Sequence, residues 1–291
     1  MQIERGVPLA QFTTLRVGGL ADFFVRAKSE DDVKRALKFA QEKQLMTFAL
    51  GSGSNVLFAD EGFRGLVIKN ELYDLEFDNL KVRVGSGVLL AALIQEAIQR
   101  KLSGLEKLVG VPGTVGGAVV GNANEIGERV NSVKVLTSKG EEKTLGGADL
   151  QFEYRGSALK GSDNFLFEVE LKFSPGGEDL QQKFAETARE KNLKQPFEGT
   201  AGSWFKNPPS SRETGLRRAS PQKKKAWELI EQAGCKNLKV GEAVVSEQHA
   251  NFFQNLGEAT AKDFLELEKQ VLEKVEERFG VKLEREVVVI D

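Results

Sequence analysis

Residues 110–127 read GVPGTVGGAVVGNANEIG, a stretch that is dense in glycine and nearly free of charge. Glycine loses more backbone entropy on folding than any other residue, so such a cluster usually marks a backbone shaped for a purpose. Gly113, Gly116 and Gly117 would let a flat ligand approach the backbone closely, and Thr114 offers a hydroxyl. The lack of charge suits an aromatic ring system better than a metal ion. A glycine-rich segment that serves only to pack a helix is the alternative.

A second glycine stretch, GSGSNVLFAD at residues 51–60, follows a short apolar segment that reads as a strand. Its consecutive backbone N–H groups could form a concavity for a phosphate or pyrophosphate, and Ser52, Ser54 and Asn55 would add side-chain donors. The stretch lacks the third glycine of the Rossmann fingerprint and the lysine of a P-loop, so neither motif applies. A tight turn that binds nothing is the alternative.

Around these stretches the pattern predicts three mixed parts. Residues 1–70 read strand, helix, strand, glycine loop and strand, with Ser29 as the helix cap. Residues 71–177 read as a second α+β part, and residues 178–280 as a third that contains a long amphipathic helix. The apolar terminal strand at 281–291 needs a sheet to join, and the first part is the expected host.

Composition excludes several function classes. The chain has 291 residues, a formal net charge of −2, one cysteine (Cys235) and one histidine (His249). No internal disulfide or multi-histidine metal centre can form, and we expect no metal, nucleic-acid or membrane partner. Without a signal pattern or a long apolar run, the chain is expected to be cytoplasmic. The basic stretch 208–225 reads as an exposed loop, with a polyanion site as the alternative.

Seven motifs occur in a fixed order along the chain: TTLRVGGLADFF, GSGSNVLFAD, GVPGTVGGAVVGNA, YRGS, AGSWFKNP, LIEQAG and LEREV. In this order they resemble the shorter type of the UDP-N-acetylenolpyruvoylglucosamine reductase family, from about residue 12 to residue 289. The resemblance implies an α+β fold. It consists of a two-part FAD-binding module of the vanillyl-alcohol-oxidase/PCMH type (1–70 with 281–291, then 71–177) and a C-terminal substrate domain (178–280).

The resemblance also implies an activity. Such an enzyme uses FAD and NADPH to reduce the enolpyruvyl group of UDP-N-acetylglucosamine enolpyruvate to the lactyl ether of UDP-N-acetylmuramate, in peptidoglycan precursor synthesis. The only partner expected is this small-molecule substrate, and a monomer is expected.

Three residues match the catalytic positions of the family. Arg155 in YRGS resembles the arginine that pairs with the substrate carboxylate, a task suited to a planar guanidinium. Ser203 in AGSWFKNP resembles the serine that protonates the carbanion. Glu286 in LEREV resembles the acid near the substrate, which could donate a hydrogen bond if burial keeps it protonated. Glu284 is a rival by position.

The remaining site residues follow from the same resemblance. FAD would be bound by Gly51, Ser52, Gly53, Ser54, Asn55, Gly113, Thr114, Gly116, Gly117 and Asn122. Substrate would be contacted by Tyr154, Lys206, Asn207 and His249. Taken alone, each of the catalytic residues and His249 has a structural reading: a salt bridge for Arg155, a cap for Ser203, an exposed strand position for Glu286 and a hydrogen-bonded histidine for His249.

Two stretches depart from the family pattern. NANEIG at residues 122–127 stands where NAGAYG is usual, so that Asn124 replaces a glycine, and asparagine tolerates left-handed backbone well. REVVVID stands where PEVRFIG is common, with Arg285 in place of proline and Val288 in place of arginine. These departures are expected to change the affinity for the cofactor and the fit of the substrate, but not the fold.

Two other functions stay open from the sequence. One is an FAD-dependent oxidase or dehydrogenase of the same wider fold with another substrate. The other is a non-catalytic relative that binds flavin or nucleotide as a sensor. The combination of YRGS and AGSWFKNP favours the reductase over the first, and the presence of Arg155, Ser203 and Glu286 together argues against the second.

Overall fold

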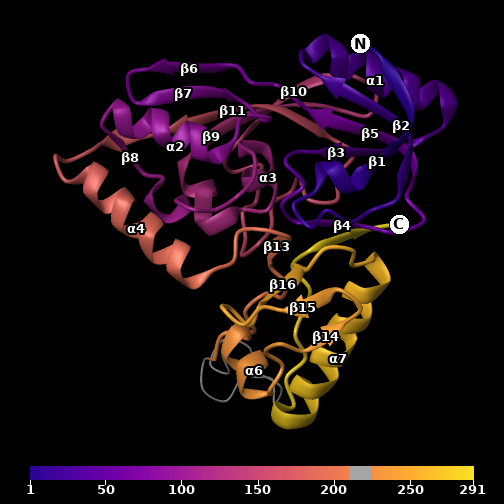
Figure 1. Cartoon of the computed structure of the whole chain (residues 1–291). Coiled ribbons are helices and arrows are strands. Elements are labelled where there is room, and N and C mark those ends of the chain that lie inside the picture. Colours follow the sequence, from indigo (N-terminus) through magenta and orange to yellow (C-terminus); the bar gives the residue numbers. More distant parts are fainter. Residues whose placement is uncertain (210–223) are drawn as a thin grey trace. The chain divides into compact units, whose positions relative to one another are not determined.

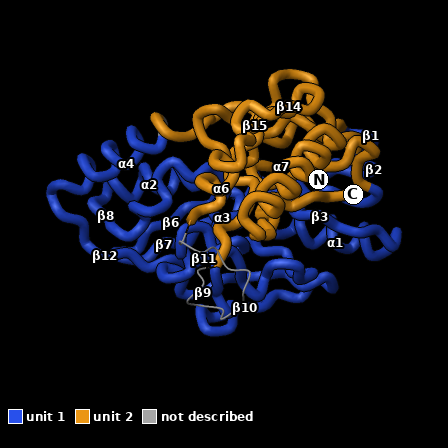
Figure 2. The backbone as a smooth tube through the Cα atoms, turned by 90° about the horizontal axis from the view of Figure 1, so that it is seen from below, with its two compact units in different colours: residues 1–7, 21–52, 64–191 blue, residues 8–20, 53–63, 192–291 orange. Residues whose placement is uncertain are grey.

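The structure, a computed structural model, describes residues 1–209 and 224–291 and mixes helices with strands, which confirms the predicted α+β class (Figure 1). The chain forms two compact units (Figure 2). Unit 1 comprises residues 1–7, 21–52 and 64–191, and unit 2 comprises residues 8–20, 53–63 and 192–291. The basic stretch 208–225 falls almost wholly outside the described residues. The division into three parts stays a prediction.

A four-stranded sheet in the order β1-β2-β5-β3 lies mainly in unit 1. Its strands are β1 (Ile3–Pro8), β2 (Leu20–Ala27), β3 (Met46–Leu50) and β5 (Phe63–Asn70). Strands β3 and β5 are parallel, so the chain between them has to cross over. Helix α1 (Glu30–Lys43) buries its apolar face, which includes Val33, Ala36 and Leu37, in the core of this sheet.

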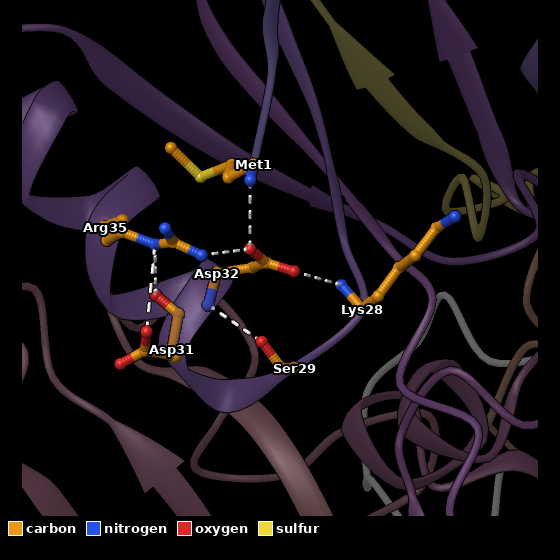
Figure 3. A network of polar contacts seen from close by, with 6 residues as sticks. All are labelled: Met1, Lys28, Ser29, Asp31, Asp32 and Arg35. Atoms are coloured by element: carbon orange, nitrogen blue, oxygen red, sulfur yellow. Dashed lines mark hydrogen bonds and ion pairs between the residues drawn. The ribbon is translucent and has the colours of Figure 1, made fainter.

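Helix α1 begins where the sequence predicts. The Ser29 hydroxyl accepts a hydrogen bond from the Asp32 backbone N–H at 3.2 Å (Figure 3). The Asp32 carboxylate accepts from the Lys28 backbone N–H at 3.1 Å and from the Arg35 guanidinium at 2.7 Å. Burial raises the pKa of this carboxyl, but the hydrogen bonds and charges lower it more, so its pKa lies below the ordinary value. The cap and the acidic first turn together fix the start of the helix.

A five-stranded antiparallel sheet in the order β10-β9-β11-β7-β6 forms the rest of unit 1. Its strands are β6 (Leu75–Asp78), β7 (Lys81–Gly85), β9 (Val130–Leu136), β10 (Glu142–Gly146) and β11 (Phe165–Lys172). Helices α2 (Leu90–Gln99) and α3 (Val115–Val120) pack into a core with these strands (Figure 1). The glycine stretch 110–127 is therefore part of this core.

Shorter elements complete unit 1. They are β8 (Leu102–Ser103), η2 (Glu106–Leu108), η3 (Ala123–Arg129), β12 (Ser174–Pro175) and α4 (Leu180–Lys194). The chain passes from unit 1 to unit 2 within the last turn of α4, at residue 192.

Unit 2 is built around a four-stranded sheet in the order β13-β16-β15-β14, whose described pairs are antiparallel. Its elements are η1 (Leu9–Phe12), β13 (Thr200–Ser203), α6 (Ala226–Gln232), β14 (Lys239–Val240), β15 (Ala243–Val245), β16 (Phe252–Asn255) and α7 (Ala261–Phe279). Helix α7 starts at the Thr260 cap and ends at Gly280 with left-handed φ, which confirms the predicted amphipathic helix. Trp204 is completely buried in the core between these elements.

The terminal strand β17 (Val288–Ile290) pairs in parallel with β4 (Val56–Phe58). Its partner therefore comes from the first 70 residues, as expected, but the strand does not join the four-stranded sheet of unit 1. The pairing connects the glycine turn before β4 with the residues around Glu286, because both precede paired strands.

Candidate active site

The two glycine stretches meet inside unit 1. Gly51 follows β3, and a Cβ atom on Gly51 would lie 2.7 Å from the Thr114 Oγ1 atom, too close for a stable contact. Gly51 is therefore required because the second stretch packs against its backbone. This contact brings two predicted cofactor-binding positions together, and it accounts for one glycine without any ligand.

The second part of the GSGSN turn belongs to unit 2. Gly53 has φ +69°, and a Cβ there would lie 2.1 Å from the carbonyl oxygen of Phe12. The Thr14 backbone N–H donates to the Gly53 carbonyl at 3.1 Å, while the Thr14 hydroxyl donates to the Thr200 carbonyl at 2.6 Å. Gly53 is thus held by protein contacts, while the flanking Ser52 and Ser54 are half-buried.

Lys69 on β5 is a residue of this site that the sequence analysis missed. Its ammonium donates a hydrogen bond to the Gly51 carbonyl, and desolvation lowers the pKa of the side chain. A partly buried cation therefore fixes the first residue of the turn predicted to hold a pyrophosphate. The available signal was one lysine at the end of the otherwise apolar run GLVIK.

The glycines of the second stretch have different roles. Gly116 packs on β7, since its added Cβ would lie 2.8 Å from the Ser86 Cβ and its N–H donates to the Ser86 carbonyl at 2.9 Å. Thr114 caps α3 and accepts from the Gly117 N–H at 3.3 Å. A Cβ on Gly117 would touch only Thr114, at 3.6 Å. A side chain at Gly117 would therefore meet mostly open space, and Gly113, with φ +136°, shapes the backbone before it.

Asn122 connects this stretch to the YRGS motif. It adopts a left-handed backbone, its side-chain oxygen accepts from the Gly127 N–H at 3.0 Å and its amide donates to the Glu153 carbonyl at 2.8 Å. Ser157 adds a second connection, because its hydroxyl donates to the Val120 carbonyl at 2.9 Å. The side chain predicted to bind cofactor thus positions the arginine turn.

Arg155 lies in a two-residue turn closed by two backbone hydrogen bonds between Glu153 and Gly156, of 3.1 and 3.2 Å. Its φ is +59°, which is unfavourable for a residue with a side chain. The guanidinium carbon lies 5.7 Å from the centre of the Tyr154 ring, and Tyr154 is 59% exposed. The turn therefore places a cation beside an aromatic ring, and contact of either with substrate stays a prediction.

The NANEIG departure has a local explanation. Asn124 and Glu125 both have left-handed backbones, which confirms that asparagine replaces glycine at a left-handed position. The Asn124 amide donates to the Lys107 carbonyl at 2.7 Å, and the Glu125 carboxylate forms an ion pair with the Lys107 ammonium. Ile126 is buried in the unit 1 core. The altered residues are thus anchored to η2.

Ser203 is half-buried at the end of β13 in unit 2, where an irregularity interrupts the pairing with β16. Gly202 before it has φ +79°. Trp204 after it donates its backbone N–H to the Asn251 carbonyl at 2.7 Å and stacks on Phe253, with ring centres 4.5 Å apart. The serine therefore lies between a glycine with left-handed backbone and a tryptophan fixed in the core.

Glu286 lies beside this segment. Its backbone N–H donates to the Trp204 carbonyl at 2.8 Å, and its own carbonyl accepts from the Asn55 amide at 3.4 Å. Glu286 is half-buried, whereas the side chain of its rival Glu284 is 76% exposed. Unit 2 thus brings Ser203, Glu286 and Asn55 together.

Two predicted substrate residues have protein partners in unit 2. The Lys206 ammonium forms an ion pair with Glu284 at 3.2 Å. The Asn207 side-chain oxygen accepts from the Ala226 N–H at 3.0 Å, at the start of α6. One of the three N–H donors of Lys206 is thus used by Glu284, whereas Asn207 organises the helix start.

His249 also has structural contacts. Its Nδ1 atom accepts from the Asn251 N–H at 3.2 Å, and its ring packs edge-on against Phe252 at 4.6 Å. Desolvation lowers the pKa of the imidazole. With Nδ1 accepting, Nε2 carries the proton of the neutral ring. These contacts match the structural alternative for His249, and a substrate contact stays a prediction.

The predicted residues are divided between the two units. Unit 1 holds Arg155 and Tyr154 with the glycine helix, and unit 2 holds Ser203 with Glu286. Unit 1 thus supplies a cation, and unit 2 supplies a serine and a glutamate on two segments that are joined by a backbone hydrogen bond. The pairing of Arg155 with the other two stays a prediction.

Among residues 1–209 and 224–291, no cluster of histidine, cysteine, aspartate and glutamate could hold a metal ion. In the same part of the chain, no helix has the length and apolar character needed to cross a membrane.

Two family models match the chain. The model described as UDP-N-acetylenolpyruvoylglucosamine reductase, C-terminal domain, matches residues 193–290. The model described as FAD binding domain matches residues 21–146, which include both glycine stretches.

Named relatives match over nearly the full length. UDP-N-acetylenolpyruvoylglucosamine reductase 2 of Symbiobacterium thermophilum is 38% identical over 99% of this chain and 92% of its own. The reductase of Carboxydothermus hydrogenoformans is 37% identical over 97% of this chain and 92% of its own. The crystal structure of UDP-N-acetylenolpyruvylglucosamine reductase from Thermus caldophilus matches with a TM-score of 0.82 and 36% identity, covering 100% of both chains.

Proposed function

The chain belongs to the UDP-N-acetylenolpyruvoylglucosamine reductase family of FAD-binding oxidoreductases, and we propose that it reduces UDP-N-acetylglucosamine enolpyruvate to UDP-N-acetylmuramate at the expense of NADPH. The observation that carries this proposal is the backbone pairing in unit 2 that sets Glu286 beside the Ser203–Trp204 segment. A proton donor next to a second acid suits protonation of a carbon after hydride addition. The product would enter peptidoglycan synthesis in the cytoplasm and thereby affect cell shape and division.

The residues of unit 1 fit FAD. Gly117 leaves open space beside an uncharged helix, and Lys69 places a cation on the turn that precedes β4. A flat ring needs the first feature, and a pyrophosphate favours the second. When bound, FAD would supply hydride equivalents taken from NADPH.

The remaining chemistry falls to the side chains of the protein. The double bond of the enolpyruvyl ether gains a hydride at its β-carbon and a proton at its α-carbon, so one π bond is lost and two C–H bonds form. NADPH supplies the electron pair and becomes NADP⁺, and the proton comes ultimately from solvent. Arg155 would pair with the substrate carboxylate, which carries the developing charge. The Ser203 hydroxyl would protonate the α-carbon, and Glu286 would hydrogen-bond the substrate.

Stopped-flow absorbance tests this proposal. The purified protein is loaded with FAD, reduced anaerobically with NADPH and mixed with the enolpyruvyl substrate. We expect rapid reoxidation in the wild type, and in Ser203→Ala a reoxidation slowed by about 10²–10⁴-fold with NADPH reduction intact, as for loss of a general acid. Ser162→Ala, at an exposed loop position, is the control.

A comparison of neighbouring carboxyls sharpens the test. Glu286→Gln should slow reoxidation, whereas Glu284→Gln should not, because Glu284 is exposed and paired with Lys206. If NADPH reduces the flavin of the wild type but the enolpyruvyl substrate does not reoxidise it, the protein is an oxidoreductase with another substrate. A protein that binds no FAD would end the proposal.

A further inference from the structure

Glu268 of helix α7 is a buried carboxylate in unit 2 that no predicted role uses. Only 5% of its surface is exposed. Its Oε2 atom accepts two hydrogen bonds, from the Trp204 indole Nε1 at 2.9 Å and from the Arg285 guanidinium Nε at 2.7 Å. Burying a carboxylate is unfavourable unless it is paired and hydrogen-bonded, so this arrangement demands an explanation.

The two donors are sequence neighbours of the proposed acids. Trp204 directly follows Ser203, and Arg285 directly precedes Glu286. The two segments also pair through their backbones, at the Phe205–Arg285 bridge and from the Glu286 N–H to the Trp204 carbonyl. One carboxylate oxygen therefore holds both segments in register.

The anchor acts on the C-terminal side of the serine. Gly202, on the N-terminal side of Ser203, has φ +79°, and its backbone N–H donates to the Thr200 hydroxyl at 3.3 Å. Trp204, on the C-terminal side, is completely buried and stacks on Phe264 as well, with ring centres 5.3 Å apart. The indole N–H bond to Glu268 sets the rotation of that ring, and with it the backbone from which the Ser203 hydroxyl projects.

We propose that Glu268 is a positioning residue for proton transfer, acting through Trp204 on Ser203 and through Arg285 on Glu286. The inference rests on the proposed function and deepens it. It also gives a role to Arg285, the residue found where the family commonly has proline. The ion pair between Arg285 and Glu268 of α7 restricts the backbone before Glu286, as a proline ring would.

The test separates the two half-reactions. Glu268→Gln keeps an acceptor for the indole but removes the charge opposite Arg285, and Arg285→Met removes the second bond at a half-exposed side chain. Both variants should take up FAD, be reduced by NADPH within twofold of the wild-type rate and bind substrate with unchanged affinity. Reoxidation by the enolpyruvyl substrate should slow by about 10–100-fold, the size of effect expected for a misplacement near 1 Å. The solvent isotope effect on this step should rise, because proton transfer becomes limiting.

A second readout does not involve activity. The chain has two tryptophans, so the indole N–H groups of Trp204 and Trp227 are distinguishable by NMR in the protein without FAD. The Trp204 indole N–H signal should shift in Glu268→Gln, because the indole then donates to a neutral acceptor in place of a charged one. Glu273→Gln, at an exposed position of the same helix, is the matched control and should change neither readout.

The outcomes are distinct. Rapid reoxidation of the wild type together with wild-type reoxidation in both variants would overturn the positioning role alone. A wild-type flavin that stays reduced in the presence of the substrate would overturn the proposed function and this inference with it. Lower thermal stability with an unchanged reoxidation rate per bound flavin would make Glu268 merely structural, which also overturns the inference.

Discussion

Arg155 illustrates how a single residue can be conformationally costly and still fit a function. Its left-handed φ of +59° is disfavoured by about 1–2 kcal/mol for a residue with a Cβ atom. Glycine would adopt the same turn without that cost. An arginine at this position is therefore expected to have a function that offsets the lost stability. Residues held in such conformations cluster at binding sites, which supports the carboxylate-binding role proposed for Arg155.

Arg155→Gly should separate stability from activity. We expect the thermal midpoint of the protein to stay equal or rise, because the backbone cost disappears. Substrate-dependent reoxidation should fall by about 10²–10³-fold, since the fixed cation is lost. Scanning calorimetry and stopped-flow absorbance measure the two effects. Arg155→Lys retains the charge but not the planar guanidinium, so its activity should lie between that of the wild type and that of Arg155→Gly. A lysine variant as active as the wild type would contradict bidentate binding.

His249 should make stability depend on pH. Its pKa is lowered by desolvation, so the unfolded chain takes up the proton at a higher pH than the folded protein does. The free energy of unfolding should therefore fall as pH drops from the unfolded value of 6.5 toward the lower folded pKa. In His249→Asn, which can still accept from Asn251, this loss should be smaller. Tryptophan-monitored denaturation at pH values on both sides of 6.5 tests the point, and identical pH profiles would refute it.

At the scale of elements, the α3–η3 segment shows which departures the fold tolerates. Asn122, Asn124 and Glu125 all have left-handed backbones, and each is connected by its side chain to a neighbouring segment. The Lys107 carbonyl also accepts from the ammonium of Lys191 on α4, at 3.2 Å. Only Asn124 of these three replaces a glycine of the family pattern, and like the other two it has a specific partner.

Glu125→Gly should stabilise the protein. Glycine removes a left-handed strain of about 1–2 kcal/mol but adds unfolded-state entropy of about 0.5–1 kcal/mol. The lost ion pair with Lys107 is exposed and contributes little. We expect a net gain of up to about 1 kcal/mol by chemical denaturation. Glu128→Gly, at an exposed position of the same segment whose φ is not among the positive values, is the control and should lose about 1 kcal/mol. A loss of stability in Glu125→Gly would show that its ion pair matters more than its backbone.

At the scale of the whole molecule, the two units have separate cores and separate optical probes. The tryptophans, Trp204 and Trp227, lie in unit 2, and the tyrosines, Tyr73 and Tyr154, lie in unit 1. The family model for FAD binding covers mostly unit 1 residues. Binding of a ligand to one folded unit stabilises that unit by mass action.

Addition of FAD to the protein without cofactor should therefore raise the tyrosine-monitored unfolding transition more than the tryptophan-monitored one. At about 100 times the dissociation constant, the stabilisation expected is about 2.7 kcal/mol. Parallel thermal scans with the two fluorescence signals measure it. An equal shift of both transitions would mean that the units unfold cooperatively when FAD is bound, and a larger shift in the tryptophan signal would contradict the prediction that FAD binds mainly to residues of unit 1.

The local signals in the sequence determined much of this protein. The Ser29 cap, the helix that ends at Gly280, the glycine turns and the ordered motifs with Arg155, Ser203 and Glu286 could all be read because caps, periodicity and motifs depend on neighbouring residues. Family membership followed from the same motifs.

Only the tertiary structure decided which residues hold those motifs in place. It showed that Gly51 is a packing glycine against Thr114, that Lys69 fixes the turn, that β17 pairs with β4, and that Glu268 joins Trp204 to Arg285. These contacts join residues that are distant in the chain. A hydrogen bond between a helix carboxylate and an indole more than sixty positions away leaves no periodic pattern, so no local signal could have predicted it.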